Sequence, residues 1–257
     1  LCSADMHVVV CVKQVPDTAN VRINPETNTL MREGVESIVN PFDEYALEQG
    51  LMLKDRHGAK LTVVSMGPPQ ATAVLRESLA RGADDAVLVS SRAFGGADTL
   101  ATSYTIAQAI KKACGGMTPD LVLFGKQAID GDTAQVGPGV SEFLGVPLVT
   151  YVRKIDVSLV EGGARFSVES VMDDGVATIE GSLPAVMTVL KEADAPRYAP
   201  LSGAIRAANA DVKVLNEKDI EANPSEIGLK GSPTKVVTIF PPPIKGGGKK
   251  IVASGAE

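Results

Sequence analysis

Residues 125–138 have the sequence GKQAIDGDTAQVGP and follow the apolar run DLVLF at residues 120–124. The apolar run predicts a buried strand, and apolar residues at helical spacing follow at positions 140–144. The stretch therefore connects the end of a strand to the start of a helix, with Asp132 and Thr133 as candidate N-caps. The N–H groups and positive dipole end of such a helix start favour an anion, often a phosphate. An ordinary strand–helix loop explains the same pattern and stays open as the alternative.

The composition predicts a soluble protein with one large core. The chain has 257 residues, 44% of them apolar and none of them Trp. Val, Ala, Leu and Ile dominate the apolar residues, as in buried parallel strands. A formal net charge of -6 argues against a nucleic-acid surface. No apolar stretch is long enough to span a bilayer, so we expect no direct membrane insertion.

The cysteines and histidines exclude several kinds of site. Three cysteines without a CxxC pair argue against a disulfide framework and for a reducing compartment, and we expect a cytoplasmic protein. Neither His7 nor His57 lies in a metal-ligand spacing, so we predict no metal site. The sequence offers no Ser-His-Asp or Cys-His set, and we predict no catalytic side chain. A bound cofactor would have to carry any chemistry.

Short apolar runs alternate with helical patterns through the first two thirds of the chain, which predicts an α/β fold: a largely parallel sheet with helices on both faces. The expected strands are residues 8–12, 61–66, 86–89 and 121–125, and the expected helices are residues 42–54, 70–81 and 98–113. Ligands of such sheets bind at the carboxyl ends of the strands. The sequence has no GxGxxG, so a dinucleotide site of that usual kind is not indicated.

The remaining segments predict hairpins and a long irregular end. A β-hairpin is expected at residues 21–31, on the rim of the sheet. Later strands are expected at residues 149–157, 164–172, 177–181 and 183–190; the first three are antiparallel and the last rejoins the sheet. Periodicity is lost from Glu192, where Pro and Gly recur, so this part should bury little against its own domain. We therefore predict an α/β domain at residues 6–191, followed at residues 192–257 by either a disordered end or an extended arm that lies on another subunit. Apolar residues at positions 236, 237, 239 and 240 favour the arm.

The sequence contains a series of ordered blocks at residues 8–18 (VVVCVKQVPDT), 40–48 (NPFDEYALE), 66–68 (MGP), 81–84 (RGAD), 125–138, 183–186 (LPAV) and 196–199 (PRYA). These blocks carry a resemblance to the β subunit of an electron-transfer flavoprotein, which covers nearly the whole chain from Met6. It implies an α/β nucleotide-binding domain of the adenine nucleotide alpha hydrolase-like type. Such a subunit pairs with a larger α subunit, which carries FAD on a mobile domain.

The resemblance also implies a choice between two nucleotides. Ordinary members hold a structural AMP in the β subunit. In a bifurcating group the same pocket holds a second FAD, which takes a hydride from NADH and sends its two electrons to different acceptors. One electron goes to ferredoxin or flavodoxin. The other goes through the mobile flavin to an acyl-CoA dehydrogenase or a quinone-linked acceptor.

The chain is more similar to the bifurcating group. Ordinary members tend to be more acidic near residues 130–132 and to continue with Asn-Gln-Thr, where this chain has Gly131 and Ala134. Small residues would leave room for a diphosphate, so we expect FAD, with AMP as the alternative. A nucleotide-binding module without a redox role is a further alternative. Such a module would not need the broken C-terminal segment or the loop at residues 196–198.

The family's binding residues can be transferred by position. Cys11 and Lys13 are expected beside the adenosine, and Asp17 and Thr18 near the flavin end. The base and ribose region should be lined by Asn40, Pro41, Phe42, Asp43, Met66 and Gly67. The phosphates should be wrapped by Gly125, Lys126, Gln127, Ala128, Ile129, Asp130, Gly131, Asp132, Thr133, Ala134, Gln135 and Val136. Residues 191–199 match the family's partner-recognition loop, but Ala193 stands near the place of its usual leucine.

Overall fold

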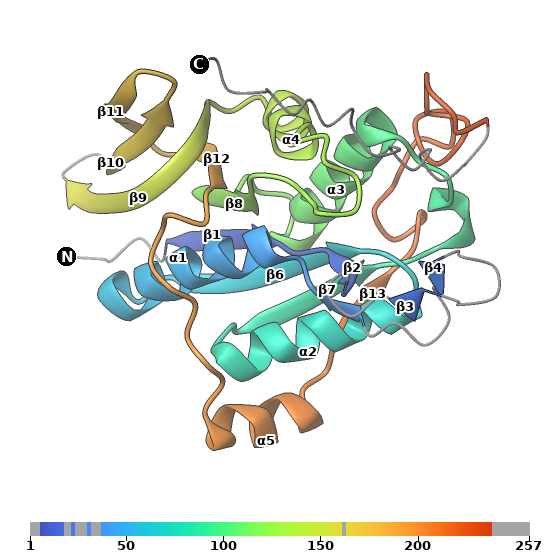
Figure 1. The fold of residues 1–257 in the computed structure, drawn as a ribbon, viewed down its shortest axis with the longest axis horizontal. Coiled ribbons are helices and arrows are strands. Elements are labelled where there is room, and N and C mark those ends of the chain that lie inside the picture. Colours follow the sequence, from blue (N-terminus) through green and yellow to red (C-terminus); the bar gives the residue numbers. More distant parts are fainter. Residues whose placement is uncertain (1–5, 18–21, 24–29, 32–36, 161–162, 238–257) are drawn as a thin grey trace, which may run out of the picture.

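The computed structural model describes residues 6–17, 22–23, 30–31, 37–160 and 163–237. Among these residues, one large sheet has the strand order β11-β10-β9-β12-β8-β1-β6-β7-β13 (Figure 1). Its strands are β1 (His7–Cys11), β6 (Lys60–Met66), β7 (Asp85–Val89), β8 (Leu121–Gly125), β9 (Leu148–Val160), β10 (Gly163–Met172), β11 (Gly175–Ser182), β12 (Ala185–Val189) and β13 (Lys213–Leu215). The short strands outside it are β2 (Gln14–Pro16), β3 (Arg22–Ile23), β4 (Leu30–Met31) and β5 (Ser37–Val39).

The middle of the sheet is parallel. β1 pairs in parallel with β6 on one side and with β8 on the other. β12 is parallel to β8 and to the start of β9, and β7 is parallel to β6. Only the β9–β10–β11 end is antiparallel among the described strands of this sheet. The predicted α/β fold with a largely parallel sheet is confirmed.

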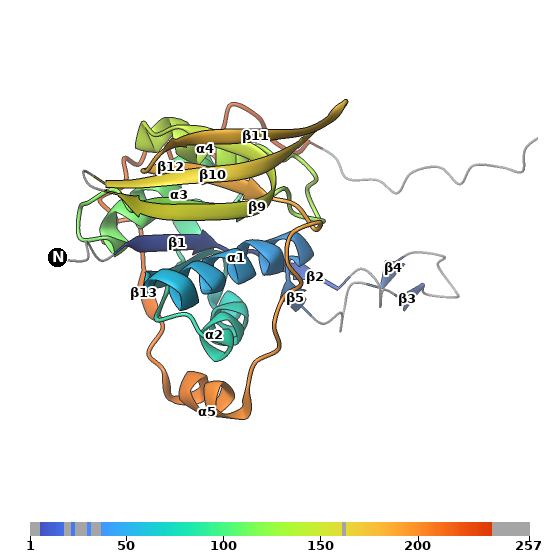
Figure 2. The ribbon, with the colours of Figure 1, turned by 90° about the vertical axis from the view of Figure 1, so that its left-hand side faces the viewer.

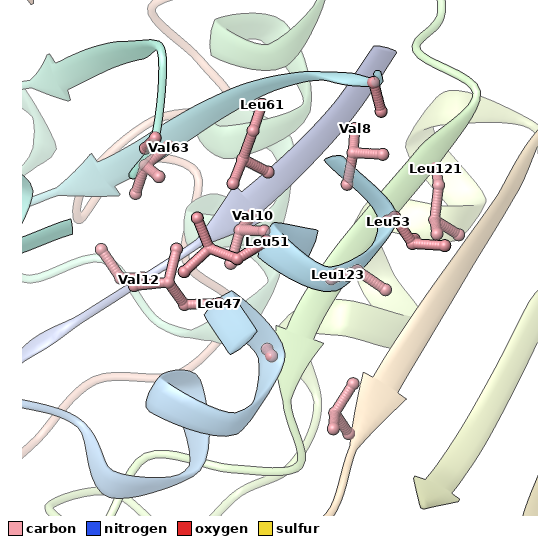
Figure 3. Close-up of a cluster of buried hydrophobic side chains, with 14 of the residues drawn as sticks. Val8, Val10, Val12, Leu47, Leu51, Leu53, Leu61, Val63, Leu121 and Leu123 are labelled. Atoms are coloured by element: carbon pink, nitrogen blue, oxygen red, sulfur yellow. The ribbon is translucent and has the colours of Figure 1, made fainter. Parts of the chain in front are cut away.

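Helices cover both faces of the sheet. They are α1 (Pro41–His57), α2 (Thr72–Arg81), α3 (Thr99–Ala113), α4 (Val136–Leu144) and α5 (Leu201–Asn209). On one face α1 and α2 bury an apolar cluster against β1, β6 and β8, in which Leu47 and Leu51 of α1 meet Val10 and Leu123 (Figure 3). On the other face α3 and α4 pack through Ile110 and neighbouring residues. Burial on both faces explains why the central strands are mostly apolar instead of alternating.

Two small antiparallel ladders precede α1. β2, which follows β1 in the chain, pairs with β5 (Figure 2). β3 pairs with β4 in the register Arg22↔Met31 and Ile23↔Leu30. The strands of the predicted hairpin are therefore present. The turn between them, residues 24–29, lies outside the described residues, as do residues 238–257 of the predicted arm.

The segment after β12 contains regular structure that the sequence analysis did not predict. β13 extends the sheet beside β7, and α5 packs on α2. Gly203 of α5 lies so close to the Ala80 carbonyl oxygen of α2 that a Cβ atom would clash with it. Further along, Ile220 and Ile227 are buried. The expectation that this part buries little against its own domain is wrong for these elements; the boundary at residue 191 and the arm stay predictions.

The close approach of α5 to α2 yields a test of this packing. We expect Gly203→Ala to push α5 away from α2 and to lower the free energy of unfolding by about 1–3 kcal/mol, as overpacking does. Ser202→Ala, at the exposed neighbouring position, should leave stability nearly unchanged. Urea denaturation of both variants measures the difference, and equal stabilities would contradict the packing described.

Candidate functional site

The carboxyl ends of β1 and β8 meet where the strand order of the sheet reverses. From β1 the chain moves outward through β6 and β7, and α3 then returns it to β8 on the other side of β1. In open α/β sheets, ligands bind in the crevice outside such a reversal. The candidate site is therefore formed by the loops after β1 and β8 together with the start of α1.

Asn40, the N-cap residue of α1, connects these two loops. Its side chain is fully buried. The Nδ2 group donates to the Gln127 carbonyl oxygen over 2.9 Å, and Oδ1 accepts the Ile129 N–H over 3.1 Å. The Asn40 backbone N–H donates to the Lys13 carbonyl oxygen over 2.8 Å. The side-chain amide of Asn40 thus holds the loop after β8 and does not cap α1. Its backbone N–H holds the loop after β1.

Asp43, in the first turn of α1, forms hydrogen bonds with the same two loops. One carboxylate oxygen accepts the Lys13 N–H over 2.8 Å, and the other accepts the Gly125 N–H over 3.1 Å. Gly125 lies so near Phe42 and Asp43 that any side chain there would collide with them. The first glycine of the stretch at residues 125–138 therefore allows the start of α1 to reach the end of β8.

Burial changes the ionisation of this carboxyl group. Desolvation raises the pKa of Asp43 to about 7, although hydrogen bonds from Asn40, Lys13 and Gly125 oppose the shift. Nearby Cys11 is also buried, and desolvation together with the Asp43 charge raises the pKa of its thiol well above the ordinary value. The Cys11 side chain belongs to the buried cluster on the α3 face. Its thiol is therefore a packed group and not a reactive one.

The raised pKa of Asp43 predicts a pH-dependent stability. A carboxyl group whose pKa is higher in the folded state stabilises the fold at low pH, and this contribution is lost as pH rises from about 4 through about 7. Asp43→Asn has no such loss. The free energy of unfolding of the variant, relative to the wild type, should therefore rise by a few kcal/mol over that range, since one pKa unit corresponds to about 1.4 kcal/mol.

Urea denaturation at several pH values measures this difference. Asp173→Asn, in the exposed turn between β10 and β11, removes the same charge and should follow the wild type. Wild-type and Asp43→Asn stabilities that change in parallel between about pH 4 and pH 8 would contradict the assignment.

The loop after β8 turns back tightly before α4 begins. The Asp132 N–H donates to the Ala128 carbonyl oxygen over 2.9 Å, and the Gln127 amide donates to the Asp132 carboxylate. Asp132 and Ala134 have left-handed backbones, with φ of 57° and 53°. Residues other than glycine rarely adopt this conformation, and they cluster at functional sites. Successive N–H groups in turns with such residues form anion-binding concavities.

The predicted N-cap role of Asp132 and Thr133 is wrong. α4 begins at Val136, and its N-cap is Gln135, whose side chain makes no capping hydrogen bond. The Gln135 amide oxygen instead accepts the Thr99 hydroxyl over 2.8 Å. The tight turn uses Asp132 before the helix starts, which explains the difference. The side chain of Gln135 therefore leaves the N–H groups of Val136 and Gly137 available to an acceptor, whereas Pro138 has no N–H.

Two lysines at the site have different partners. Lys13 forms an ion pair with Asp130, and Nζ lies 2.7 Å from the nearer carboxylate oxygen. The Lys126 Nζ lies 5.3 Å from the centre of the Tyr151 ring, a cation–π contact. Lys13 therefore stands between the two strand ends, whereas Lys126 is directed toward the β9 side of the loop.

The other predicted residues surround this centre. Pro41 and Phe42 open α1. Met66 ends β6, and the N–H of Gly67 donates to the Val89 carbonyl oxygen over 3.0 Å. Asp17 follows β2. Thr18 lies outside the described residues, and the ligand contacts of all these residues stay predictions.

Three neighbours of the site were not predicted from the sequence. Tyr151 has a left-handed backbone with φ of 55°, and its N–H donates to the Thr188 hydroxyl over 3.2 Å. Thr188 is buried and lies so close to Gly137 of α4 that a Cβ atom there would clash with it. The Lys191 ammonium lies 4.6 Å from the centre of the Phe42 ring. All three come from distant positions, and a strained tyrosine inside a strand has no local sequence signal.

Metal-ligating clusters and membrane-spanning helices are both absent from the described part of the chain. Within it, no group of three or more His, Cys, Asp and Glu side chains could hold a metal ion. None of its helices combines the length and the apolar character needed to cross a bilayer.

Comparison with known proteins identifies the family. Residues 27–220 match the family model described as "Electron transfer flavoprotein domain". The chain belongs to the electron transfer flavoprotein family. An electron transfer flavoprotein subunit beta of Clostridium acetobutylicum is 51% identical over 246 residues, which is 96% of this chain and 92% of that protein. The resemblance found in the sequence is thereby confirmed.

Two further relatives cover the chain to a similar extent, and the name of the first refers to a complex. The caffeyl-CoA reductase-Etf complex subunit CarD of Acetobacterium woodii is 48% identical over 250 residues, covering 97% of this chain and 93% of that protein. Protein FixA of Azotobacter vinelandii is 49% identical over 238 residues, covering 92% of this chain and 84% of that protein. As a flavoprotein β subunit by family, this chain has an α subunit as its partner.

Proposed function

We propose that this β subunit binds FAD in the crevice between the ends of β1 and β8, and that its complex divides electrons from NADH between two acceptors. The observation that carries the proposal is the loop at residues 125–136. It is fixed at the strand reversal and combines two left-handed residues with a helix start that lacks a side-chain cap. This donor set fits a phosphate group.

The space around the loop favours a diphosphate over a monophosphate. A Cβ atom at Gly131 would meet no heavy atom within 4 Å, so the site is open there. Ala134 adopts the second left-handed position with only a methyl side chain. A larger or acidic residue at either place would reduce this room or repel the phosphates. The structural AMP of ordinary members remains the second candidate, since one phosphate can use the same N–H groups.

The redox role follows from the cofactor and not from the side chains. When bound, FAD accepts a hydride and can pass on its electrons singly. The residues of this chain bind and orient it. We assign Lys13 to the phosphates and not to the adenosine, where the resemblance had suggested it, because its ammonium group pairs with Asp130 of the phosphate loop. The α4 start also lies at the phosphates, and the segment at residues 40–43 lies at the strand ends. The CarD relative is named for a caffeyl-CoA reductase complex. By that analogy we propose an acyl-CoA dehydrogenase or quinone-linked acceptor for one electron and ferredoxin or flavodoxin for the other, in the cytoplasm.

Nucleotide extraction from the purified α–β complex tests this proposal. Acid-released nucleotide, separated by chromatography, should be FAD from both subunits with no AMP. Anaerobic addition of NADH should bleach the flavin absorbance of the complex. AMP in the extract, or flavin that NADH leaves oxidised, would assign the chain to the ordinary electron carriers.

A pair of variants at one position links the result to the loop. Gly131→Asp adds a negative charge in the open space and should lower the FAD content of the complex about tenfold or more, since charged hydrogen-bonding sites are worth about 1.5–3 kcal/mol. Gly131→Ala adds a methyl group without charge and should retain FAD. Equal FAD contents in the two variants would show that residue 131 does not face the phosphates.

A further inference from the structure

The ion pair between Lys13 and Asp130 crosses the candidate crevice. The Lys13 Nζ lies 2.7 and 2.8 Å from the two carboxylate oxygens of Asp130. Lys13 belongs to the loop after β1 and Asp130 to the loop after β8, so their side chains bridge the two strands at which the order reverses. The pair therefore lies where the family's nucleotide is expected.

Both backbones are fixed by buried groups of α1. The Lys13 N–H is held by Asp43, and the Lys13 carbonyl oxygen accepts the Asn40 N–H. On the other loop, Asn40 holds Gln127 and Ile129, the residue before Asp130. The two charged side chains are much less constrained, because 48% of the Lys13 side chain and 32% of the Asp130 side chain are exposed. They can exchange partners without any movement of the strands.

The interaction energies favour a change of the Lys13 partner from Asp130 to a phosphate. A half-exposed ion pair is worth little, because water already solvates both charges. A nucleotide is a stronger partner for the ammonium group than one carboxylate, since the FAD diphosphate carries one negative charge on each of its two phosphates and AMP carries up to two on one, and their oxygens accept charge-assisted hydrogen bonds from Lys13. The second lysine of the loop, Lys126, is directed toward Tyr151. Lys13 is thus the cation best placed for a phosphate in this crevice, and Asp130 neutralises it.

We propose that Asp130 lowers the nucleotide affinity of the site by competing with the ligand's phosphate for Lys13. The inference rests on the proposed nucleotide binding and adds to it a residue that sets affinity. A phosphate that takes Lys13 displaces the Asp130 carboxylate into solvent. The loss of that ion pair and the repulsion between carboxylate and phosphate both reduce the net gain on binding.

The competition is tested in the α–β complex after its nucleotide has been removed, with AMP and FAD as calorimetric probes. Asp130→Asn removes the charge at constant shape and should lower the Kd about two- to fivefold, the range expected for an exposed ion pair. Lys13→Gln should raise the Kd about tenfold or more. In the Lys13→Gln background, Asp130→Asn should change the Kd by less than about 1.5-fold, because no contested cation remains.

Two controls accompany these variants. Asp173→Asn changes the net charge equally at a distant exposed turn and should leave the Kd unaltered. Asp130→Ser repeats the charge removal with a smaller side chain, in case the asparagine perturbs the loop. Thermal unfolding of each complex shows whether the variant is folded.

The outcomes separate this inference from the proposed function. Tighter binding by Asp130→Asn that disappears in the Lys13→Gln background supports the competition. Weaker binding by Asp130→Asn, or an equal gain in both backgrounds, overturns it while the site remains a nucleotide site. A wild-type complex that binds neither AMP nor FAD overturns the proposed function and this inference with it.

Discussion

The candidate site depends on the hydrogen bonds that two buried side chains at the start of α1 make to the ends of β1 and β8. Asn40 and Asp43 each bond to both strand-end loops. A buried polar group left without its partner costs about 1–3 kcal/mol of stability. Movement of either loop away from Asn40 and Asp43 would leave such groups unpaired and is therefore unfavourable. The apolar helix–sheet interface thus positions two polar groups that fix the loops of the candidate site. The loop at residues 125–136 can then retain its left-handed turns, because its base is fixed at Gly125, Gln127 and Ile129.

The same helix also holds the segment that matches the family's partner-recognition loop. Arg197 donates to the buried carboxylate of Glu48 over 2.8–3.0 Å and pairs with Asp55 over 2.8 Å. Lys191 lies over Phe42, at the end of α1 nearest the crevice. Beyond Arg197, the ring of Tyr198 is 96% exposed. Helix α1 therefore supports the proposed nucleotide site at its start and, along its length, the segment that the resemblance assigns to partner recognition.

The parts of the fold that follow from apolar periodicity could be predicted, and the parts that depend on small residues or single long-range contacts could not. Runs such as residues 121–125 predict buried strands directly. α5 gives no such signal, because it packs through Gly203 and Ala207 while Leu201 and Ile205 remain exposed. The long-range bonds of α5 come from Arg76 and Arg206, which hold carbonyl oxygens of the partner helix. β13 has only three residues, too few for an alternating pattern.

In the candidate site, too, the sequence predicted which segments meet but not the long-range contacts of single residues. The resemblance brought the loops after β1 and β8 together with residues 40–43, and the structure places these segments side by side. The resemblance could not predict which residue of these segments forms which hydrogen bond. Asn40 and Asp43 support backbone groups of residues 13, 125, 127 and 129, and no local sequence pattern encodes such distant contacts. Asp132 is used by the turn before α4 instead of by the helix, since residues 128–132 close on themselves first. Those outcomes depend on tertiary geometry.

Amide hydrogen exchange, measured residue by residue on the intact α–β complex after removal of nucleotide, tests the central claim most directly. The N–H groups of Lys13, Gly125 and Ile129 donate to the Asp43 and Asn40 side chains. If α1 holds these loops by itself, all three should exchange as slowly as the buried strand amides, before any nucleotide is added. Exchange at the rate of exposed loop amides, with protection only after nucleotide binds, would show that the ligand and not α1 organises the site.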